Sequence, residues 1–483
     1  MNAATSTRTA DRTADRTAAA RTASGSRPAD TRSAAAAGAA AGAKGADGAV
    51  EELCSAVFAS LRRKDQRERG RQYVQGLLTA EGRKSIRNIA LQLDRAGAAG
   101  GAGAAAAEQS LHHFIAASTW DWQPIRAALA EYLGRTAPLN AWVAQPMAIP
   151  KGGEHSVGAG HRFDPHRGQM FRGQQAFGIW YTSAPVVTPV GWRLFLDEES
   201  APASSQDSVQ GCGTGEEESY AGCAVSGVLN AVREARLPVR PVVLDVRDIA
   251  TRSTLHRFAE ARVPVVARIG AEARLLVTDP RVPGFGAGTM AARDVLQNVR
   301  GLRMPVEWPD PEVPGARRTS LVAAVRVMVP DPAQGRRREV LLFGEWEAAR
   351  RLPTQLWVTD MVRTDPAALV RMTKTALRVS AASAASVQRV GLRDFSGRSL
   401  PGWHRHVTLA SVAHAALCLA APAAAARPDA PPAPVSRPAG TPGAAPVPVP
   451  VPVAVAVAAR AGALAAARAR HPAAVHRPAL AAH

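Results

Sequence analysis

Residues 241–246 read P-V-V-L-D-V and decide the fold, because they form an apolar run that ends in an acid. Such a run is typical of a strand that is buried on both faces at the centre of a sheet. The sequence predicts a helix on each side of it, at Ala221–Glu234 and Thr251–Ala261, and then a second buried strand at Val263–Ile269. Strands and helices that alternate in this way are typical of an α/β domain.

Three more strands are predicted upstream, at Ala141–Ile149, Gln174–Tyr181 and Trp192–Leu196, and they have the pattern of an antiparallel meander. A loop rich in Ser, Glu and Gly follows at Asp197–Glu218. The predicted order is therefore three strands, helix, strand, helix, strand, which makes a mixed sheet.

The flanking segments complete the predicted domain organisation. Residues 51–135 have the apolar spacing of several helices, and residues 140–420 form the α/β domain. Within it, residues 271–362 are predicted to be β-rich, with strands at Val322–Val329, Glu339–Phe343 and Gln355–Thr359. Helices are predicted to return at Ala367–Ser380 and Gly402–Ala420.

Both ends of the chain are of low complexity. Residues 1–50 repeat T-A-D-R, and residues 421–483 are rich in Ala and Pro, with a P-V-P-V-P-V-P-V run at Pro446–Val453. Such segments bury too little apolar surface to offset the entropy of ordering, so we expect both to be disordered.

Composition limits the class of protein. The net charge is +19, and residues 51–420 keep +11 of it, which favours a polyanionic partner such as nucleic acid. An arginine-rich coding bias is the alternative explanation. Four widely spaced Cys argue against a disulfide scaffold or a zinc ribbon. No signal peptide and no membrane-spanning run is visible, so we expect a cytoplasmic protein and no membrane partner.

Three places in the sequence are candidates for chemistry. Asp245 ends a buried strand, where a carboxylate is placed to hold a divalent cation or to cap the next helix. Lys151, in the glycine-rich stretch I-P-K-G-G, is placed to meet a phosphate or belongs to an ordinary turn. The run Trp403, His404, Arg405 and His406 begins the last helix, where it suits a phosphate contact or a capping cluster.

Nine stretches together carry a resemblance to a known family. They are, in chain order, L-R-R-K-D-Q-R-E-R-G-R-Q-Y-V-Q-G-L-L, E-G-R-K-S-I-R-N-I-A, S-L-H-H-F-I, W-D-W-Q-P-I-R, I-P-K-G-G-E-H-S-V-G, W-R-L-F-L, V-V-L-D, P-T-Q-L-W and G-L-R-D-F-S-G-R-S-L-P-G-W-H-R-H-V-T-L. From about residue 53 to 420 the chain resembles the DDE-type transposases of bacterial insertion sequences, specifically the insertion sequence 701 family.

The resemblance implies an RNase H-like core with an inserted β region and an N-terminal helical region that binds DNA. It also implies three carboxylates that hold two Mg²⁺ ions for an in-line attack on a DNA phosphodiester. The second acid matches Asp245. Gln145 and Pro146 occupy the positions of the first acid, and Ser380 occupies that of the third.

The resemblance therefore predicts a transposase-family protein with an impaired centre, for which Mg²⁺ binding is doubtful. Its expected partners are double-stranded DNA at element ends and a second copy of the chain, and its expected location is the bacterial nucleoid. Lys151, Arg378 and the run 403–406 are the candidate DNA contacts. The alternatives are a non-catalytic repressor of a related element and a nuclease that uses displaced acids, for which Glu154, Asp164 and Asp248 are the candidates.

Overall fold

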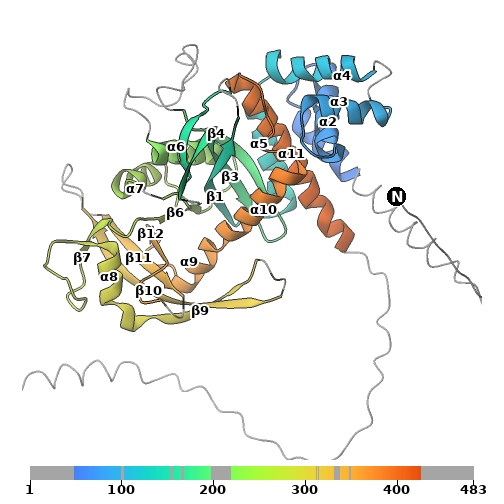
Figure 1. Ribbon diagram of the computed structural model, residues 1–483. Coiled ribbons are helices and arrows are strands. Elements are labelled where there is room, and N and C mark those ends of the chain that lie inside the picture. Colours follow the sequence, from blue (N-terminus) through green and yellow to red (C-terminus); the bar gives the residue numbers. More distant parts are fainter. Residues whose placement is uncertain are drawn as a thin grey trace, which may run out of the picture. The chain divides into compact units, whose positions relative to one another are not determined.

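The V-V-L stretch lies at the centre of a mixed sheet (Figure 1). It forms strand β5 (Val242–Leu244), which pairs in parallel with β1 (Ala141–Pro150) on one side and with β6 (Val265–Arg268) on the other. All three residues of β5 are buried. The predicted position of this strand, and its predicted neighbour at residues 141–149, are confirmed.

The computed structural model describes residues 48–98, 103–152, 156–164, 168–196, 219–247, 249–311, 313, 315–330, 338–347 and 350–425. Residues 48–58 are helical. The later α-helices are α2 (Lys64–Thr79), α3 (Ile86–Arg95), α4 (Gly103–His112), α5 (Gln123–Thr136), α6 (Tyr220–Glu234), α7 (Thr251–Glu260), α8 (Ala292–Asn298), α9 (Pro366–Thr373), α10 (Thr375–Arg389) and α11 (Leu400–Ala425).

The described strands join into one sheet. The remaining ones are β2 (Gly160–Asp164), β3 (Gln169–Thr182), β4 (Val187–Leu194), β7 (Arg274–Val277), β8 (Thr289–Ala291), β9 (Met304–Pro309), β10 (Arg317–Val329), β11 (Arg338–Trp346) and β12 (Gln355–Thr359). Their order is β2-β3-β1-β5-β6-β12-β11-β10-β7-β8, while β4 pairs with β3 and β9 pairs with β10.

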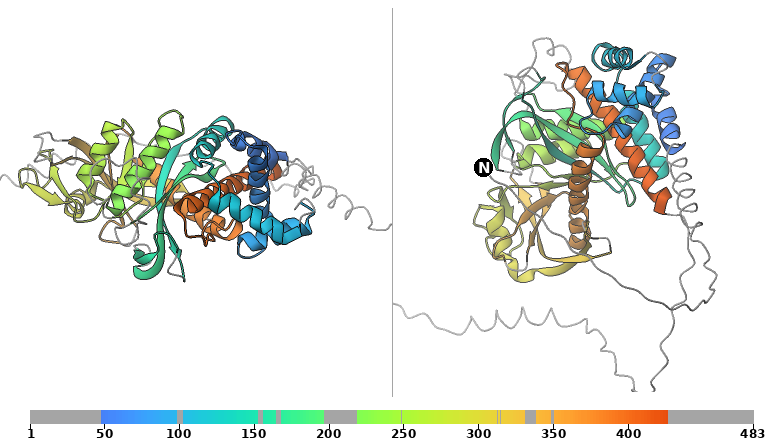
Figure 2. Two further views of the ribbon diagram at one scale, coloured as in Figure 1. Left: turned by 90° about the horizontal axis from the view of Figure 1, so that it is seen from above. Right: turned by 45° about the vertical axis from the view of Figure 1, so that its right-hand side comes forward.

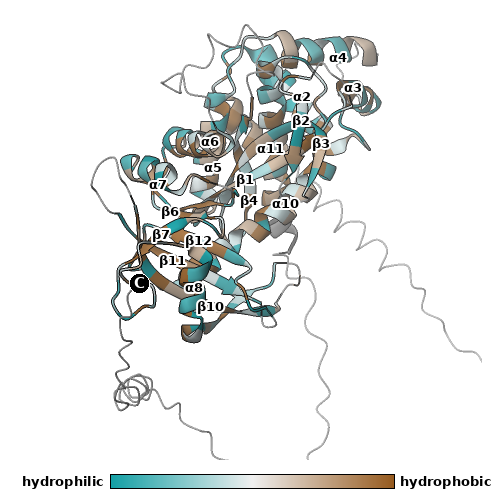
Figure 3. Ribbon diagram, turned by 60° about the vertical axis from the view of Figure 1, so that its left-hand side comes forward, coloured by the Kyte–Doolittle hydropathy of each residue, from teal (hydrophilic) through white to brown (hydrophobic). Residues whose placement is uncertain are grey.

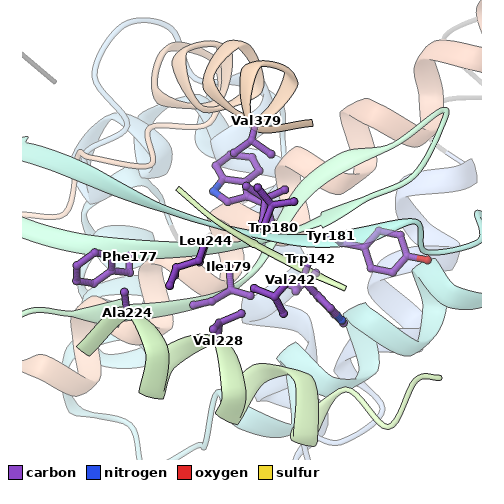
Figure 4. Close-up of a cluster of buried hydrophobic side chains, with 14 of the residues drawn as sticks. Trp142, Phe177, Ile179, Trp180, Tyr181, Ala224, Val228, Val242, Leu244 and Val379 are labelled. Carbon is purple, nitrogen blue, oxygen red and sulfur yellow. The ribbon is translucent and has the colours of Figure 1, made fainter. Parts of the chain in front are cut away.

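The part of the sheet from β4 through β3, β1 and β5 to β6 is an RNase H-like core. Helices cover both of its faces: in Figure 4, Val379 of α10 lies on one side of the strands, and Ala224 and Val228 of α6 lie on the other. These three side chains are fully buried or nearly so. Because both faces are covered, the central strand β5 is apolar and buried throughout, as its sequence predicts; Figure 3 shows the hydropathy along the chain.

The inserted region is β-rich, as predicted, and also contains α8, which was not predicted. A buried ion pair joins it to the start of α10. Lys374 donates to both carboxylate oxygens of Glu345 on β11, at 2.6 Å for Oε2, and its Nζ lies 4.4 Å from the centre of the Trp308 ring on β9. Ser320 donates to Glu345 Oε1 at 2.5 Å, so the carboxylate has several partners. Such a pair holds its elements in one geometry.

Several predicted boundaries are wrong. The single helix expected at Ala367–Ser380 is two helices, because the chain breaks at Lys374 between α9 and α10. The strand expected at Gln174–Tyr181 begins earlier, at Gln169, because it pairs with the unpredicted strand β2. The strand expected at Trp192–Leu196 lies at Val187–Leu194.

Helix α11 joins the N-terminal helices to the core (Figure 2). From Trp403 to Ala416 its residues are buried or, for His404, nearly so. A fully buried Arg126 on α5 ties it to the sheet: Nε donates to Thr408 Oγ1 at 2.8 Å, Nη1 donates to the Trp192 carbonyl at 3.1 Å, and Nη2 donates to His404 Nδ1 at 3.1 Å. Burial lowers the pKa of Arg126 to about 9.

The predicted disordered ends fall mostly outside the described residues. Of residues 1–50 the structure describes 48–50, and of residues 421–483 it describes 421–425, which are helical. Within the described ranges, no helix is long and apolar enough to cross a membrane.

We expect Arg126→Ala to lower the free energy of unfolding by about 2–4 kcal/mol, because it leaves three buried acceptors without a donor. Urea unfolding measures this. The control is Arg135→Ala on the same helix, whose side chain is 58% exposed, pairs with Glu131 and lies over the Tyr132 ring. That change should cost less than about 0.5 kcal/mol. Equal effects of the two substitutions would show that Arg126 does not hold α5, β4 and α11 together.

Candidate functional site

Asp245 follows β5 at the carboxyl end of the central strands, and three elements meet there. Its backbone N–H donates to the Ala144 carbonyl of β1 at 3.1 Å. The next residue of β1, Gln145, donates from Nε2 to Asp245 Oδ2 at 3.0 Å and to Ser380 Oγ of α10 at 3.2 Å. The same Nε2 lies 2.9 Å from the Ala376 carbonyl. Positions that are far apart in the chain therefore converge within hydrogen-bond distance.

A fourth residue belongs to this cluster and was not predicted. Arg268, the last residue of β6, donates from Nη1 to Asp245 Oδ1 at 2.9 Å. The two side chains are 17% and 10% exposed, so water screens the pair poorly. A signal for it exists in the sequence: P-V-V-L-D and P-V-V-A-R pair in parallel with Leu244 opposite Ala267, which places Arg268 beside Asp245.

Pro146 does not join the cluster. Successive side chains of a strand point to opposite faces of the sheet, so Pro146 points away from the face on which Gln145 meets Asp245. Of the two positions left open for the first acid, the geometry favours Gln145.

The side chains at this centre do not suit a divalent cation. Mg²⁺ needs several oxygen ligands, and carboxylates are the usual ones. Here both oxygens of Asp245 already accept N–H groups, one of them from a guanidinium, while Gln145 and Ser380 are neutral. Within the described ranges, no group of three or more His, Cys, Asp or Glu side chains is placed to hold a metal ion. The centre therefore does not match the two-Mg²⁺ site that the sequence resemblance implied.

The other candidate acids do not replace the missing carboxylates of the metal site. Asp164 lies on β2 opposite Gln169, and its charge acts on Tyr220 of α6. The hydrogen-bond partners of the Asp245 carboxylate are Gln145 and Arg268 instead. Glu154 and Asp248 lie outside the described residues.

The ammonium group of Lys151, a predicted phosphate contact, is hydrogen-bonded within the protein. Its Nζ donates to the carbonyls of Arg393 at 2.9 Å and Phe395 at 2.5 Å. Burial, together with the nearby charge of Arg83, lowers the pKa of Lys151 to about 8. The ammonium therefore fastens the end of β1 to the loop before α11.

The run Trp403 to His406 forms a packing cluster, and its predicted phosphate contact has no support in this geometry. Trp403 is 1% exposed, and Arg405, 6% exposed, donates to the carbonyls of Trp120 and Ile115. His406 donates from Nε2 to the Gly391 carbonyl and accepts at Nδ1 from the hydroxyl of Tyr73.

His404 completes the packing cluster. It stacks on Trp122 with ring centroids 4.7 Å apart.

The side chain of Arg378 also forms hydrogen bonds within the protein. It donates to the carbonyls of Ser183 and Ala184 at 2.8 Å each and so binds α10 to the turn between β3 and β4. Burial lowers the pKa of Arg378, as expected for a cation without a carboxylate partner. Its predicted role as a DNA contact has no support in this geometry.

We expect the protein to lose stability in mild acid because three histidines of α11 are buried in the neutral form. Burial lowers the pKa of His406 and His414 from 6.5 to about 4 and holds the pKa of His404 well below its ordinary value. The unfolded chain then binds more protons, so their contribution is complete above about pH 6.5 and is lost as pH falls toward 4.

Urea unfolding at a series of pH values tests this. His406→Gln with His414→Gln should flatten the loss of stability between pH 6.5 and 4, because two of the three groups no longer titrate. His113→Gln, at an exposed position directly after α4, should leave it unchanged. An unaltered slope in the double variant would contradict the assignment.

Comparison with known proteins gives one match. A model of the DDE superfamily endonucleases matches residues 56–328, which is more than half of the chain. A search of curated proteins found no match. The matched region contains Gln145, Asp245 and Arg268 and ends before α10, which carries Ser380.

Proposed function

Because the chain belongs to the DDE superfamily endonucleases, we propose that it is a transposase-family protein of the insertion sequence 701 type that binds DNA without cleaving it. The family acts on DNA, and a transposase-like function follows from membership. The loss of cleavage is our inference from the centre around Asp245.

The observation that carries this proposal is the pairing of Asp245. In the family, bound divalent cations stabilise the attacking and leaving oxygens of the phosphodiester. In this chain the carboxylate of Asp245 accepts from Arg268 on one oxygen and from Gln145 on the other. A cation at that point would have to displace a guanidinium and would gain a single anionic ligand, so the centre favours the internal ion pair.

The charge of the chain supports DNA binding. Residues 51–420 carry +11, and Arg62, Arg63 and Lys64 at the start of α2 are exposed. Cations of this kind bind the phosphate backbone by releasing its counterions. We therefore propose double-stranded DNA as the partner, nucleoid association as its consequence, and a homodimer on DNA as the assembly.

A non-catalytic repressor of a related element is the second candidate function. The internally paired centre favours it, since such a protein needs to bind DNA and not to cut it. Sequence-specific binding to the inverted ends of a related element, in competition with random DNA, would distinguish it from a transposase remnant that binds all DNA alike.

We expect the protein to bind duplex DNA with an affinity that falls steeply with salt, by a log–log slope of about −0.9 for each phosphate contact. Fluorescence anisotropy of a labelled duplex measures this. Removal of residues 1–47 and 426–483 should keep most of the affinity. If circular dichroism shows that the truncated chain is folded but it has no salt-sensitive affinity for DNA, the basic charge reflects amino-acid composition and not DNA binding.

We expect the unmodified chain not to cleave DNA that bears family-type ends in Mg²⁺ or Mn²⁺. The triple variant Gln145→Asp, Ser380→Glu and Arg268→Gln should gain Mn²⁺ binding, because it supplies three carboxylates and removes the competing guanidinium. Calorimetry measures the binding, and a plasmid nicking assay measures cleavage.

The matched control places the new acid one residue further, as Pro146→Asp with the same two other changes. Because Pro146 faces the other side of the sheet, this variant has one carboxylate fewer at the centre and should bind Mn²⁺ more weakly than the triple variant. Mg²⁺-dependent cleavage by the unmodified chain that is abolished by Asp245→Ala would overturn the proposal.

A further inference from the structure

Strands β2 and β3 form a two-stranded ribbon beyond the end of the central sheet. The pairing of β3 with β1 ends at Gly173 opposite Pro150, and the Lys151 N–H makes one more bond, to the Arg172 carbonyl. From there outward, β2 is the only described strand that pairs with β3. The ribbon leaves the sheet at its carboxyl edge, the same edge at which Asp245 lies, since β1 and β5 are parallel.

The base of the ribbon is held in a fixed position. Gly160 pairs with Gly173, and a Cβ at Gly173 would lie 2.2 Å from the Ile149 carbonyl oxygen, so only glycine allows the three strands to meet. Gln174 donates from Nε2 to the Val157 carbonyl at 2.6 Å, and Gln175 donates from Nε2 to the Phe163 carbonyl at 2.5 Å. These contacts bend the ribbon toward the protein and hold it in one position, with one face buried and the other outward.

The two faces of the ribbon differ in character. One face carries Arg162, which lies over the Phe195 ring at 5.3 Å, and Asp164, and both are buried. The other face presents Phe163 and Met170, which are cross-strand partners and are 51% and 63% exposed. Where apolar and polar residues alternate along a strand, the exposed face is usually polar, so an exposed Phe–Met pair is unusual.

A cationic side chain, that of Arg172, lies beside this apolar pair. The next cross-strand pair on the same exposed face is His161 and Arg172. Lys151 is bonded through its backbone to Arg172, and Arg83 lies close enough to lower the pKa of Lys151. The acid of the ribbon, Asp164, is buried on the opposite face. The exposed face therefore combines the apolar pair with the guanidinium of Arg172, which complements a nucleic acid better than it complements an apolar protein surface.

We propose that the β2–β3 ribbon is a DNA-binding arm that enters a groove of the duplex and places Phe163 and Met170 against the bases. A two-stranded ribbon fits the major groove, and apolar side chains on such elements open base steps. Met170 lies eight positions along β3 from Gly178, the partner of Gln145, so the ribbon and the centre would contact different parts of the duplex. This inference rests on the proposed DNA binding.

The test uses the full chain and a duplex of about 30 base pairs. With p-benzoylphenylalanine at position 163, ultraviolet light should cross-link the protein to DNA. The same group at position 304, which is 57% exposed in the inserted region, should not cross-link.

A second experiment compares two matched double variants. Phe163→Ser with Met170→Ser should weaken duplex binding about five- to tenfold and abolish the fluorescence rise of 2-aminopurine in the duplex. Leu302→Ser with Met304→Ser removes side chains that are 68% and 57% exposed elsewhere and should change neither. All four positions are exposed, so the melting temperature should remain unchanged in both variants.

Three results would overturn the inference. If the unmodified chain binds DNA but position 163 does not cross-link and the ribbon variant binds equally well, the arm fails and DNA binding stands. If the unmodified chain shows no salt-sensitive affinity, both fail. If the ribbon variant lowers the mass of a DNA-free assembly and keeps its DNA affinity, the apolar pair joins two copies of the chain.

Discussion

The parallel register of β1, β5 and β6 is the constraint on which the rest of the structure depends. Because Trp142, Val242 and Val265 lie side by side, the residues three positions further along form a second row: Gln145, Asp245 and Arg268. Polar side chains in such a row meet at the carboxyl edge of the strands, where open sheets place their sites. A shift of one residue in either strand would turn one of these side chains to the opposite face.

The row also needs α10 to be held above it. Ser380 reaches Gln145 because α10 begins immediately after Lys374, whose ammonium is fixed by Glu345 of the inserted region. The other end of the assembly depends on α11, where Arg126 joins α5, β4 and α11 through three acceptors. Buried cations thus hold the covering helices in place, each by a different set of partners.

Much of this arrangement is predictable from the sequence, and the failures have physical causes. The apolar runs identify β1, β5 and β6, and the spacing of motifs brings Gln145, Asp245 and Ser380 to one place. Arg268 was missed because its role depends on strand register, which becomes visible only when P-V-V-L-D and P-V-V-A-R are placed side by side. The run from Trp403 to His406 was misread because three of its four residues are polar. The groups that Arg405 bonds, the carbonyls of Trp120 and Ile115, lie more than 280 residues earlier in the sequence. Strand β2 escaped notice because its five residues form a ribbon outside the main sheet.

The composition of the centre has an energetic consequence of its own. Three carboxylates at one point repel one another and raise each other's pKa values unless cations compensate them, so such a centre is costly to fold when it is empty. In this chain the only carboxylate of the trio is Asp245, and it is compensated by Arg268 and hydrogen-bonded by Gln145. The group is neutral as a whole and has its hydrogen bonds satisfied, as a buried polar cluster requires. Positions that in a metal-dependent nuclease would oppose folding therefore act here as part of the core that stabilises it, which is the reverse of the usual conflict between activity and stability.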